Sequence, residues 1–171
     1  MTDQPILTAE RLRELCHYDY ETGVFWKLPA TTARLNCAAM CRKLGCLNIT
    51  SGYVVVGVNK EQFYAHRLAW LYMTGEWPKD QIDHKNGNRA DNKFDNLRDA
   101  TDGQNKQNRQ RAQVDNKCGF LGVHWNKQAN KWQSELKTAG KKMYLGQFSN
   151  PEYASDAYLK AKRLKHSYCT I

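Results

Sequence analysis

The N-terminal part of the chain has the pattern of a short helix followed by a strand. Thr8 can cap a helix that runs to about Cys16, with Leu7 and Leu12 at the two positions of a hydrophobic staple. The segment 23–27 is short, aromatic and β-branched, as strands are. This part is therefore predicted to form a small sheet with one helix.

The next segment combines a valine-rich hairpin with an amphipathic helix. Residues 53–58 are β-branched and turn back into residues 62–64, which predicts a hairpin. Residues 65–74 place apolar side chains on one helical face. Gly75 can end this helix, and Pro78 prevents its continuation.

A strand, a second strand and a helix are predicted between residues 81 and 108. Residues 81–84 have the pattern of a short strand, and residues 85–88 supply turn formers that include a glycine. Residues 97–98 are predicted to be a brief second strand. Thr101 can cap a helix that carries Asn105.

The C-terminal part has three short strand patterns and a final helix. The strands are predicted at residues 122–125, 131–136 and 142–146, with turn formers between them. Asn150 can cap the helix, with Pro151 at its first position. The predicted apolar stripe of this helix is Ala154, Ala157, Tyr158, Ala161 and Leu164. The whole pattern predicts an α+β fold, in which a small N-terminal β-sheet with helices leads into a ββα segment, followed by a three-stranded antiparallel sheet packed on one C-terminal helix.

Charge is divided unevenly along the chain, whose net charge is +9. Residues 1–103 hold 13 Lys or Arg and 13 Asp or Glu, whereas residues 104–171 hold 13 and 4. Basic surfaces serve solubility, but an excess confined to one part also favours a polyanionic partner such as nucleic acid. The polar, basic stretch between the two parts predicts a first domain at residues 1–108, a linker at 109–117 and a second domain at 118–171.

Composition narrows the class of protein further. No apolar run approaches the roughly 20 residues that span a bilayer, and the first residues lack the basic and apolar regions of a secretory signal. A cytoplasmic location is therefore expected. Cys37, Cys41 and Cys46 are clustered, but without paired C-x-x-C spacing or an evident fourth ligand, so free thiols are expected and a structural zinc is not.

The candidate chemistry lies at Asp83 and His84. Asn96 follows the histidine by twelve residues, and Asn105 follows by nine more. Hydrolysis of a phosphodiester with one metal ion needs a base, an anionic metal ligand and a group that orients the base, and these residue types supply them. A carboxylate and a carboxamide oxygen suit Mg²⁺ or Mn²⁺. An Asp-His pair alone is typical of a surface turn, so the argument depends on the whole spacing.

Residues 50–108 resemble the His-Asn-His (HNH) endonucleases with a ββα-metal fold, especially their homing and phage-encoded branch. The resemblance implies that His84 is the general base and that Asn96 bonds its other ring nitrogen. It implies that Asp83 and Asn105 bind one divalent ion in a core at about residues 80–110. The matching segments are residues 65–70, 82–88, 95–98 and 104–108.

Residues 118–168 resemble the APETALA-type DNA-binding domain of plant ethylene-response factors, whose sheet lies in the major groove. The matching residues are Gly122, Val123, Trp132, Glu135, Leu136, Tyr144, Leu145, Gly146, Phe148, Ala154, Ala157, Tyr158 and Ala161. The resemblance implies DNA-facing positions at His124, Asn126, Glu135, Lys137, Lys142 and Tyr144. Several of these are arginine in the plant family, so its sequence preference is not expected to transfer. Further DNA contacts are expected at Arg67, Arg98, Arg109 and Arg111.

The leading hypothesis is a divalent-metal-dependent DNA endonuclease anchored to duplex DNA by its basic domain. It is expected to be a monomer or weak dimer without a small-molecule cofactor, and its relatives suggest a phage-encoded protein that acts in a bacterial host. The alternative is a non-catalytic, sequence-specific DNA-binding regulator. A third interpretation is an RNA-directed protein, although no RNA-recognition signature is present.

Overall fold

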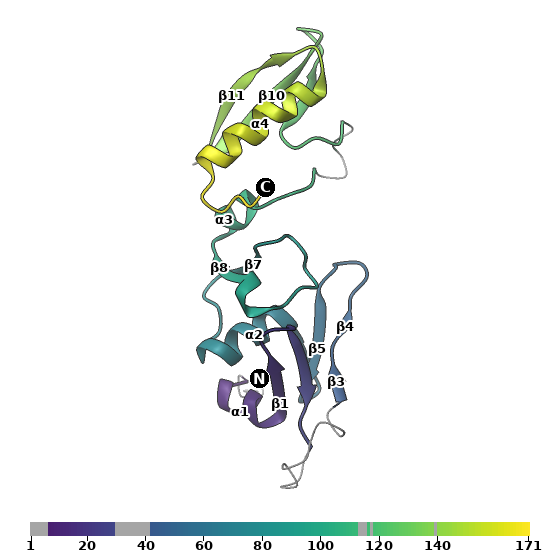
Figure 1. Ribbon diagram of the computed structural model, residues 1–171, viewed down its shortest axis with the longest axis vertical. Helices are drawn as coiled ribbons and strands as arrows, with labels where there is room; N and C mark the ends of the chain where they lie inside the picture. The colour runs from purple at the N-terminus through teal and green to yellow at the C-terminus, as the bar shows by residue number, and fades with distance from the viewer. Residues whose placement is uncertain (1–6, 30–41, 113–115, 117, 139) are drawn as a thin grey trace, which may run out of the picture. The chain divides into compact units, whose positions relative to one another are not determined.

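The computed structural model consists of short helices and small antiparallel sheets (Figure 1), which confirms the predicted α+β class. It describes residues 7–29, 42–112, 116, 118–138 and 140–171. The chain forms two compact units, Met1–Thr101 and Asp102–Ile171. The predicted domains at residues 1–108 and 118–171, joined by a linker at 109–117, stay a prediction. None of the helices in the described part of the chain is long and apolar enough to cross a membrane.

The first unit opens with the predicted helix. Helix α1 spans Ala9–Leu15, and the Thr8 hydroxyl accepts a hydrogen bond from the Arg11 backbone N–H at 3.2 Å. The next three strands form one antiparallel sheet in the order β1-β2-β3. They are β1 (Cys16–Asp19), β2 (Val24–Lys27) and β3 (Arg42–Leu44), of which only β2 was predicted.

A second sheet and a helix follow. Its strands are β4 (Cys46–Leu47), β5 (Val54–Val58) and β6 (Glu61–Tyr64), paired in the order β4-β5-β6. Helix α2 spans Ala65–Thr74, as predicted, and ends where Gly75 adopts a left-handed φ of 85°. That conformation favours glycine because a Cβ would be strained there.

The ββα segment is also formed. Strand β7 (Gln81–His84) pairs antiparallel with β8 (Leu97–Ala100), and the short 3₁₀ helix η2 (Phe94–Asn96) lies in the connecting loop. Helix α3 (Asp102–Gln107) follows and begins the second compact unit.

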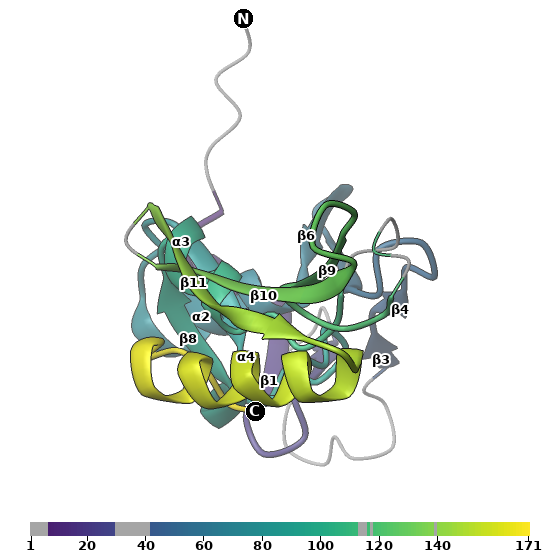
Figure 2. The same ribbon diagram turned by 90° about the horizontal axis from the view of Figure 1, so that it is seen from above.

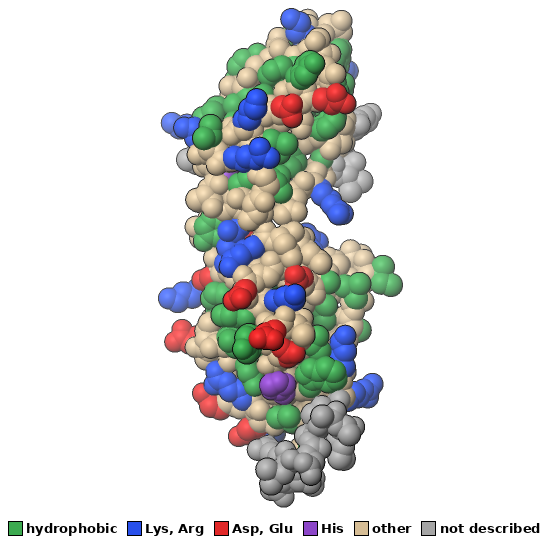
Figure 3. Space-filling model, in the orientation of Figure 1, with side chains coloured by type: hydrophobic (Ala, Val, Ile, Leu, Met, Phe, Trp, Pro, Cys, Tyr) green, Lys and Arg blue, Asp and Glu red, His purple; other side chains and the backbone are tan. Residues whose placement is uncertain are grey.

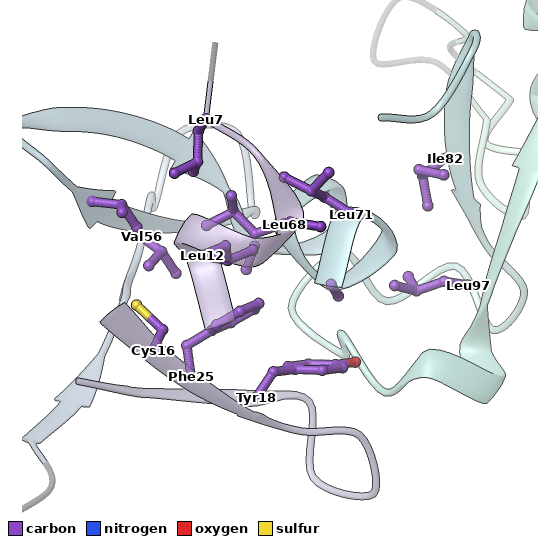
Figure 4. Packing of buried hydrophobic residues seen from close by; sticks show 14 residues of the cluster. Leu7, Leu12, Cys16, Tyr18, Phe25, Val56, Leu68, Leu71, Ile82 and Leu97 are labelled. Carbon is purple, nitrogen blue, oxygen red and sulfur yellow. The ribbon is translucent and has the colours of Figure 1, made fainter. Parts of the chain in front are cut away.

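A hydrophobic core joins these elements of the first unit (Figure 4). Leu12, Phe25, Val56 and Leu68 are each at most 1% exposed. Burial of one such side chain contributes about 1.5–3 kcal/mol, so the β1–β2 hairpin, β5 and α2 stabilise one another. Ile82 and Leu97 extend the core to β7 and β8, and thereby fix the candidate site on the rest of the unit.

The second unit contains the predicted three-stranded sheet and final helix. The strands β9 (Val123–Asn126), β10 (Lys131–Thr138) and β11 (Lys141–Phe148) pair in the order β11-β10-β9. Helix α4 (Pro151–Lys165) lies across one face of this sheet (Figure 2). The Asn150 side chain accepts a bond from the Glu152 N–H at 2.7 Å and caps the helix as predicted.

The predicted apolar stripe of α4 is wrong at its end. Leu164 is 82% exposed, whereas Lys162 is only 1% exposed and donates to the carbonyl oxygen of Arg109. At 3.6 residues per turn, positions 162 and 164 lie about 80° to either side of the buried Ala154, so the helical period alone does not separate them. The aliphatic stem of Lys162 fills the position, and the carbonyl satisfies its ammonium group.

Two glycines offer a test of the packing between α4 and the sheet. Gly119 and Gly122 have similar positive φ angles, but a Cβ on Gly122 would lie 2.2 Å from the Tyr158 ring, while one on Gly119 would meet nothing within 4 Å. Gly122→Ala should lower the free energy of unfolding by about 1–3 kcal/mol more than Gly119→Ala, because it adds overpacking to the shared backbone strain. Urea denaturation of both variants measures the difference, and equal destabilisation would contradict the packing.

Candidate active site

The β7–β8 hairpin carries four of the predicted site residues. Asp83 and His84 lie side by side at the end of β7, and each is only 4% exposed. The register places Arg98 opposite Asp83 and Leu97 opposite His84. Asn96 immediately precedes β8, in the loop that connects the strands. The hairpin therefore gathers Asp83, His84, Asn96 and Arg98 in one small region of the first unit.

Arg98 forms an ion pair with Asp83. Its Nε and Nη2 atoms donate to Asp83 Oδ2 at 2.8 and 2.7 Å. A buried carboxylate without compensation would be costly, and this guanidinium offsets the cost of burying Asp83. Arg98 was predicted only as a DNA contact, and that role stays a prediction. Its position opposite Asp83 could have been found only if the hairpin register had been known.

His84 lies in an aromatic and polar enclosure. Its ring centroid is 5.1 Å from that of His66 and 5.9 Å from that of Tyr53. Its Nε2 atom is 3.3 Å from Asn92 Oδ1. Burial lowers the pKa of His84, although the Asn92 bond and the nearby Asp83 oppose the shift. The imidazole is therefore neutral near pH 7 and able to accept a proton.

The Asn96 carboxamide braces the connecting loop. Its Oδ1 accepts from the Asn86 N–H at 3.0 Å, and its Nδ2 donates to the Asp91 carbonyl at 2.8 Å. It is Asn92, 2% exposed, whose carboxamide meets the His84 ring. The predicted role of Asn96 in orienting the base stays a prediction. No local signal in the sequence distinguishes Asn92 from the other asparagines of this loop.

His66 and Arg67 lie next to each other at the start of α2, and Arg67 is one of the expected DNA contacts. His66 is 7% exposed, and its ring stacks on Tyr64 with centroids 5.5 Å apart. Burial, with the charges of His84 and Arg67, lowers the pKa of His66 to about 3. Arg67 donates to the Asp80 carbonyl at 3.3 Å and lies over the Trp77 ring, so its guanidinium is partly engaged within the fold.

The remaining predicted residues lie in the second unit. Asn105 is half-buried on α3, and Arg109 and Arg111 are exposed after that helix. Asn108, close behind Asn105, accepts a bond from the Thr170 hydroxyl at 2.6 Å.

The predicted DNA-facing residues share one face of the β9–β11 sheet. Cross-strand register pairs Glu135 with Tyr144 and Lys137 with Lys142, and paired residues project to the same side. The same alternation places His124 and Asn126 on this side, through their partners Gln133 and Lys131. Leu136 and Ser134 are buried on the opposite side, where α4 packs. On the α4 side (Figure 3), blue Lys and Arg side chains are dispersed among hydrophobic ones.

The side chains that could bind a metal ion are considered next. Among the described residues, no group of three or more His, Cys, Asp and Glu side chains could hold a metal ion. Of the clustered cysteines, Cys46 is an exposed free thiol, and Cys37 and Cys41 lie outside the described residues.

Comparison with known proteins points to the same segment. Residues 63–107 match the model of a family described as HNH endonuclease. Comparisons with curated proteins and with solved structures found no match. The matched segment includes α2, the β7–β8 hairpin and α3, and it supports a nuclease-type domain there.

The buried His66 predicts a dependence of stability on pH. Its folded pKa of about 3 lies below the ordinary value of 6.5, so the unfolded chain binds the proton more readily. The stabilising contribution is present above pH 6.5 and is lost as pH falls toward 3, at up to about 1.4 kcal/mol per pH unit. Urea denaturation between pH 7 and pH 4 should show a shallower decline for His66→Phe than for wild type. The same change at the exposed His17 should leave the slope unaltered, and equal slopes for wild type and His66→Phe would refute the assignment.

Proposed function

We propose that this chain is a divalent-metal-dependent DNA endonuclease. The observation that carries the proposal is the pair of buried side chains at the end of β7, Asp83 and His84, within the segment that matches the HNH endonuclease model. A carboxylate and a neutral imidazole on neighbouring residues are the two groups that hydrolysis of a phosphodiester needs first: an anionic ligand and a base.

His84 acts as the general base in this proposal. Its lowered pKa keeps the imidazole unprotonated at neutral pH, so it can take a proton from the attacking water. The contacts of the ring with His66, Tyr53 and Asn92 restrict its orientation. A base that is already oriented loses little freedom when substrate binds.

Asp83 and Asn105 are the proposed ligands of one Mg²⁺ or Mn²⁺ ion. Both offer hard oxygen donors, and Arg98 pairs with the Asp83 carboxylate, so the donor set fits such an ion in type. The assignment of Asn105 follows from the family resemblance. When bound, the cation supplies positive charge that offsets the charge developing on the leaving 3′ oxygen.

The second unit anchors the chain to double-stranded DNA in this proposal. Its predicted DNA-facing residues lie on the sheet face opposite α4, and Tyr144 is 58% exposed there. Lys137 and Lys142 offer exposed cations, although Lys142 also lies 3.4 Å from the Glu135 carboxylate. Phosphate contacts by such lysines provide affinity, whereas base contacts provide sequence preference.

Removal of the base or of the carboxylate should impair cleavage without abolishing DNA binding. With supercoiled plasmid and Mg²⁺, His84→Ala should nick about 10²–10⁴-fold more slowly than wild type, the range that a general base contributes. Asp83→Asn should require more Mg²⁺. His17→Ala, at an exposed histidine on β1, is the matched control and should cleave normally. A wild-type protein that retards DNA in a gel but never nicks it would support a non-catalytic regulator instead.

The anchoring role predicts a change in salt dependence. Replacement of both Lys137 and Lys142 by Ala should weaken DNA binding and reduce the slope of log K against log salt by about 0.9 for each phosphate that the protein no longer neutralises. The control replaces Lys160 and Lys165, which are exposed on α4, and should leave the slope closer to wild type. Equal effects of the two double variants would argue against the sheet face as the DNA-binding surface.

A further inference from the structure

Asn92 is a buried loop residue with a defined contact to the candidate base. It is 2% exposed, and its Oδ1 atom lies 3.3 Å from His84 Nε2. Its Nδ2 atom donates to the Ala90 carbonyl at 3.1 Å. Because that bond needs an N–H donor, it determines which end of the carboxamide faces the imidazole.

The orientation of the carboxamide determines where the imidazole carries its proton. An amide oxygen can only accept a hydrogen bond, so His84 Nε2 must be the donor of this contact. A neutral imidazole holds a single N–H, which places the lone pair on Nδ1. Nδ1 is then the basic atom of the ring.

The β1–β2 hairpin holds Asn92 from the other side. The Tyr18 hydroxyl donates to the Asn92 carbonyl at 2.6 Å, and burial raises the pKa of Tyr18, so the hydroxyl keeps its proton. A Cβ on Gly23 would lie 2.5 Å from the Asn92 carbonyl carbon, so this turn packs directly on the loop backbone. The Phe94 N–H also donates to the Tyr20 carbonyl at 3.2 Å.

We propose that Asn92 is a positioning residue that holds His84 in the Nε2–H tautomer, and that the β1–β2 hairpin fixes Asn92 through Tyr18 and Gly23. The catalytic consequence rests on the proposed nuclease function, but the tautomer does not. The hairpin, which lies outside the segment that matches the family model, thereby acquires a part in orienting the base. Asn96 braces the loop while Asn92 holds the ring.

The tautomer can be measured directly in the full-length protein. Long-range ¹H–¹⁵N correlation spectra of ¹⁵N-histidine protein distinguish the two tautomers, and His84→Gln identifies the signals of His84. Wild type should show a single Nε2–H form. Asn92→Leu removes the acceptor and should give a mixture or the Nδ1–H form, whereas Asn92→Asp keeps an oxygen acceptor and should preserve Nε2–H. Wild-type His84 in the Nδ1–H form would overturn the proposal by itself.

Kinetics and a conservative pair of variants complete the test. Asn92→Leu should lower kcat for plasmid nicking at least about tenfold with KM unchanged, since a misplaced proton disables a base worth roughly 10²–10⁴-fold. Tyr18→Phe removes one oxygen and should shift the tautomer in the same direction. Tyr20→Phe, at a ring that is 56% exposed in the same hairpin, should change neither quantity. Wild-type spectra and kcat in both Asn92→Leu and Tyr18→Phe would refute the positioning role, whereas a wild type that never cleaves would refute only the nuclease function.

Discussion

The first unit depends on the burial of two polar side chains at the end of one short strand. Asp83 and His84 are each 4% exposed, and neither could be withdrawn from water without a partner. Arg98 donates two hydrogen bonds to the Asp83 carboxylate, and the Asn92 carboxamide forms one with the His84 imidazole. The cost of burial thus forces the surrounding loop and hairpin into a defined arrangement, and that arrangement also suits a base and a metal ligand.

The core supplies the rigidity that this arrangement needs. Tyr18 shows the connection most clearly, because its ring packs on Phe25 at 4.7 Å while its hydroxyl bonds the Asn92 carbonyl. One side chain thereby belongs both to the hydrophobic core and to the support of the candidate site. A loop of asparagines and glycine would otherwise have few apolar contacts to restrict its motion, since few of its side chains are apolar.

Local signals predicted much of the secondary structure and the central pair of site residues. Helix α2 could be bounded because Gly75 ends it, and α4 because Asn150 caps it. Strands β1 and β3 were missed because their pairing with β2 depends on the fold and not on local composition. The same limit applies to the site: Asp83 and His84 stand out in the sequence, but the partners Arg98, Asn92 and Tyr18 emerge only from tertiary packing. The burial of Lys162 was not predicted because it depends on a backbone carbonyl that the helical period does not reveal.

Charge is divided unevenly between the two parts of the chain. Residues 1–103 carry no net charge, and within them Arg98 forms an ion pair with Asp83. Buried and internally compensated groups attract a polyanion weakly, because they present little uncompensated charge to solvent. The excess of nine positive charges in residues 104–171 can instead supply long-range attraction, although salt screens it. In the function proposed above, the energy that holds DNA would therefore come from side chains that take no part in the chemistry, while the proposed base stays neutral and the carboxylate paired.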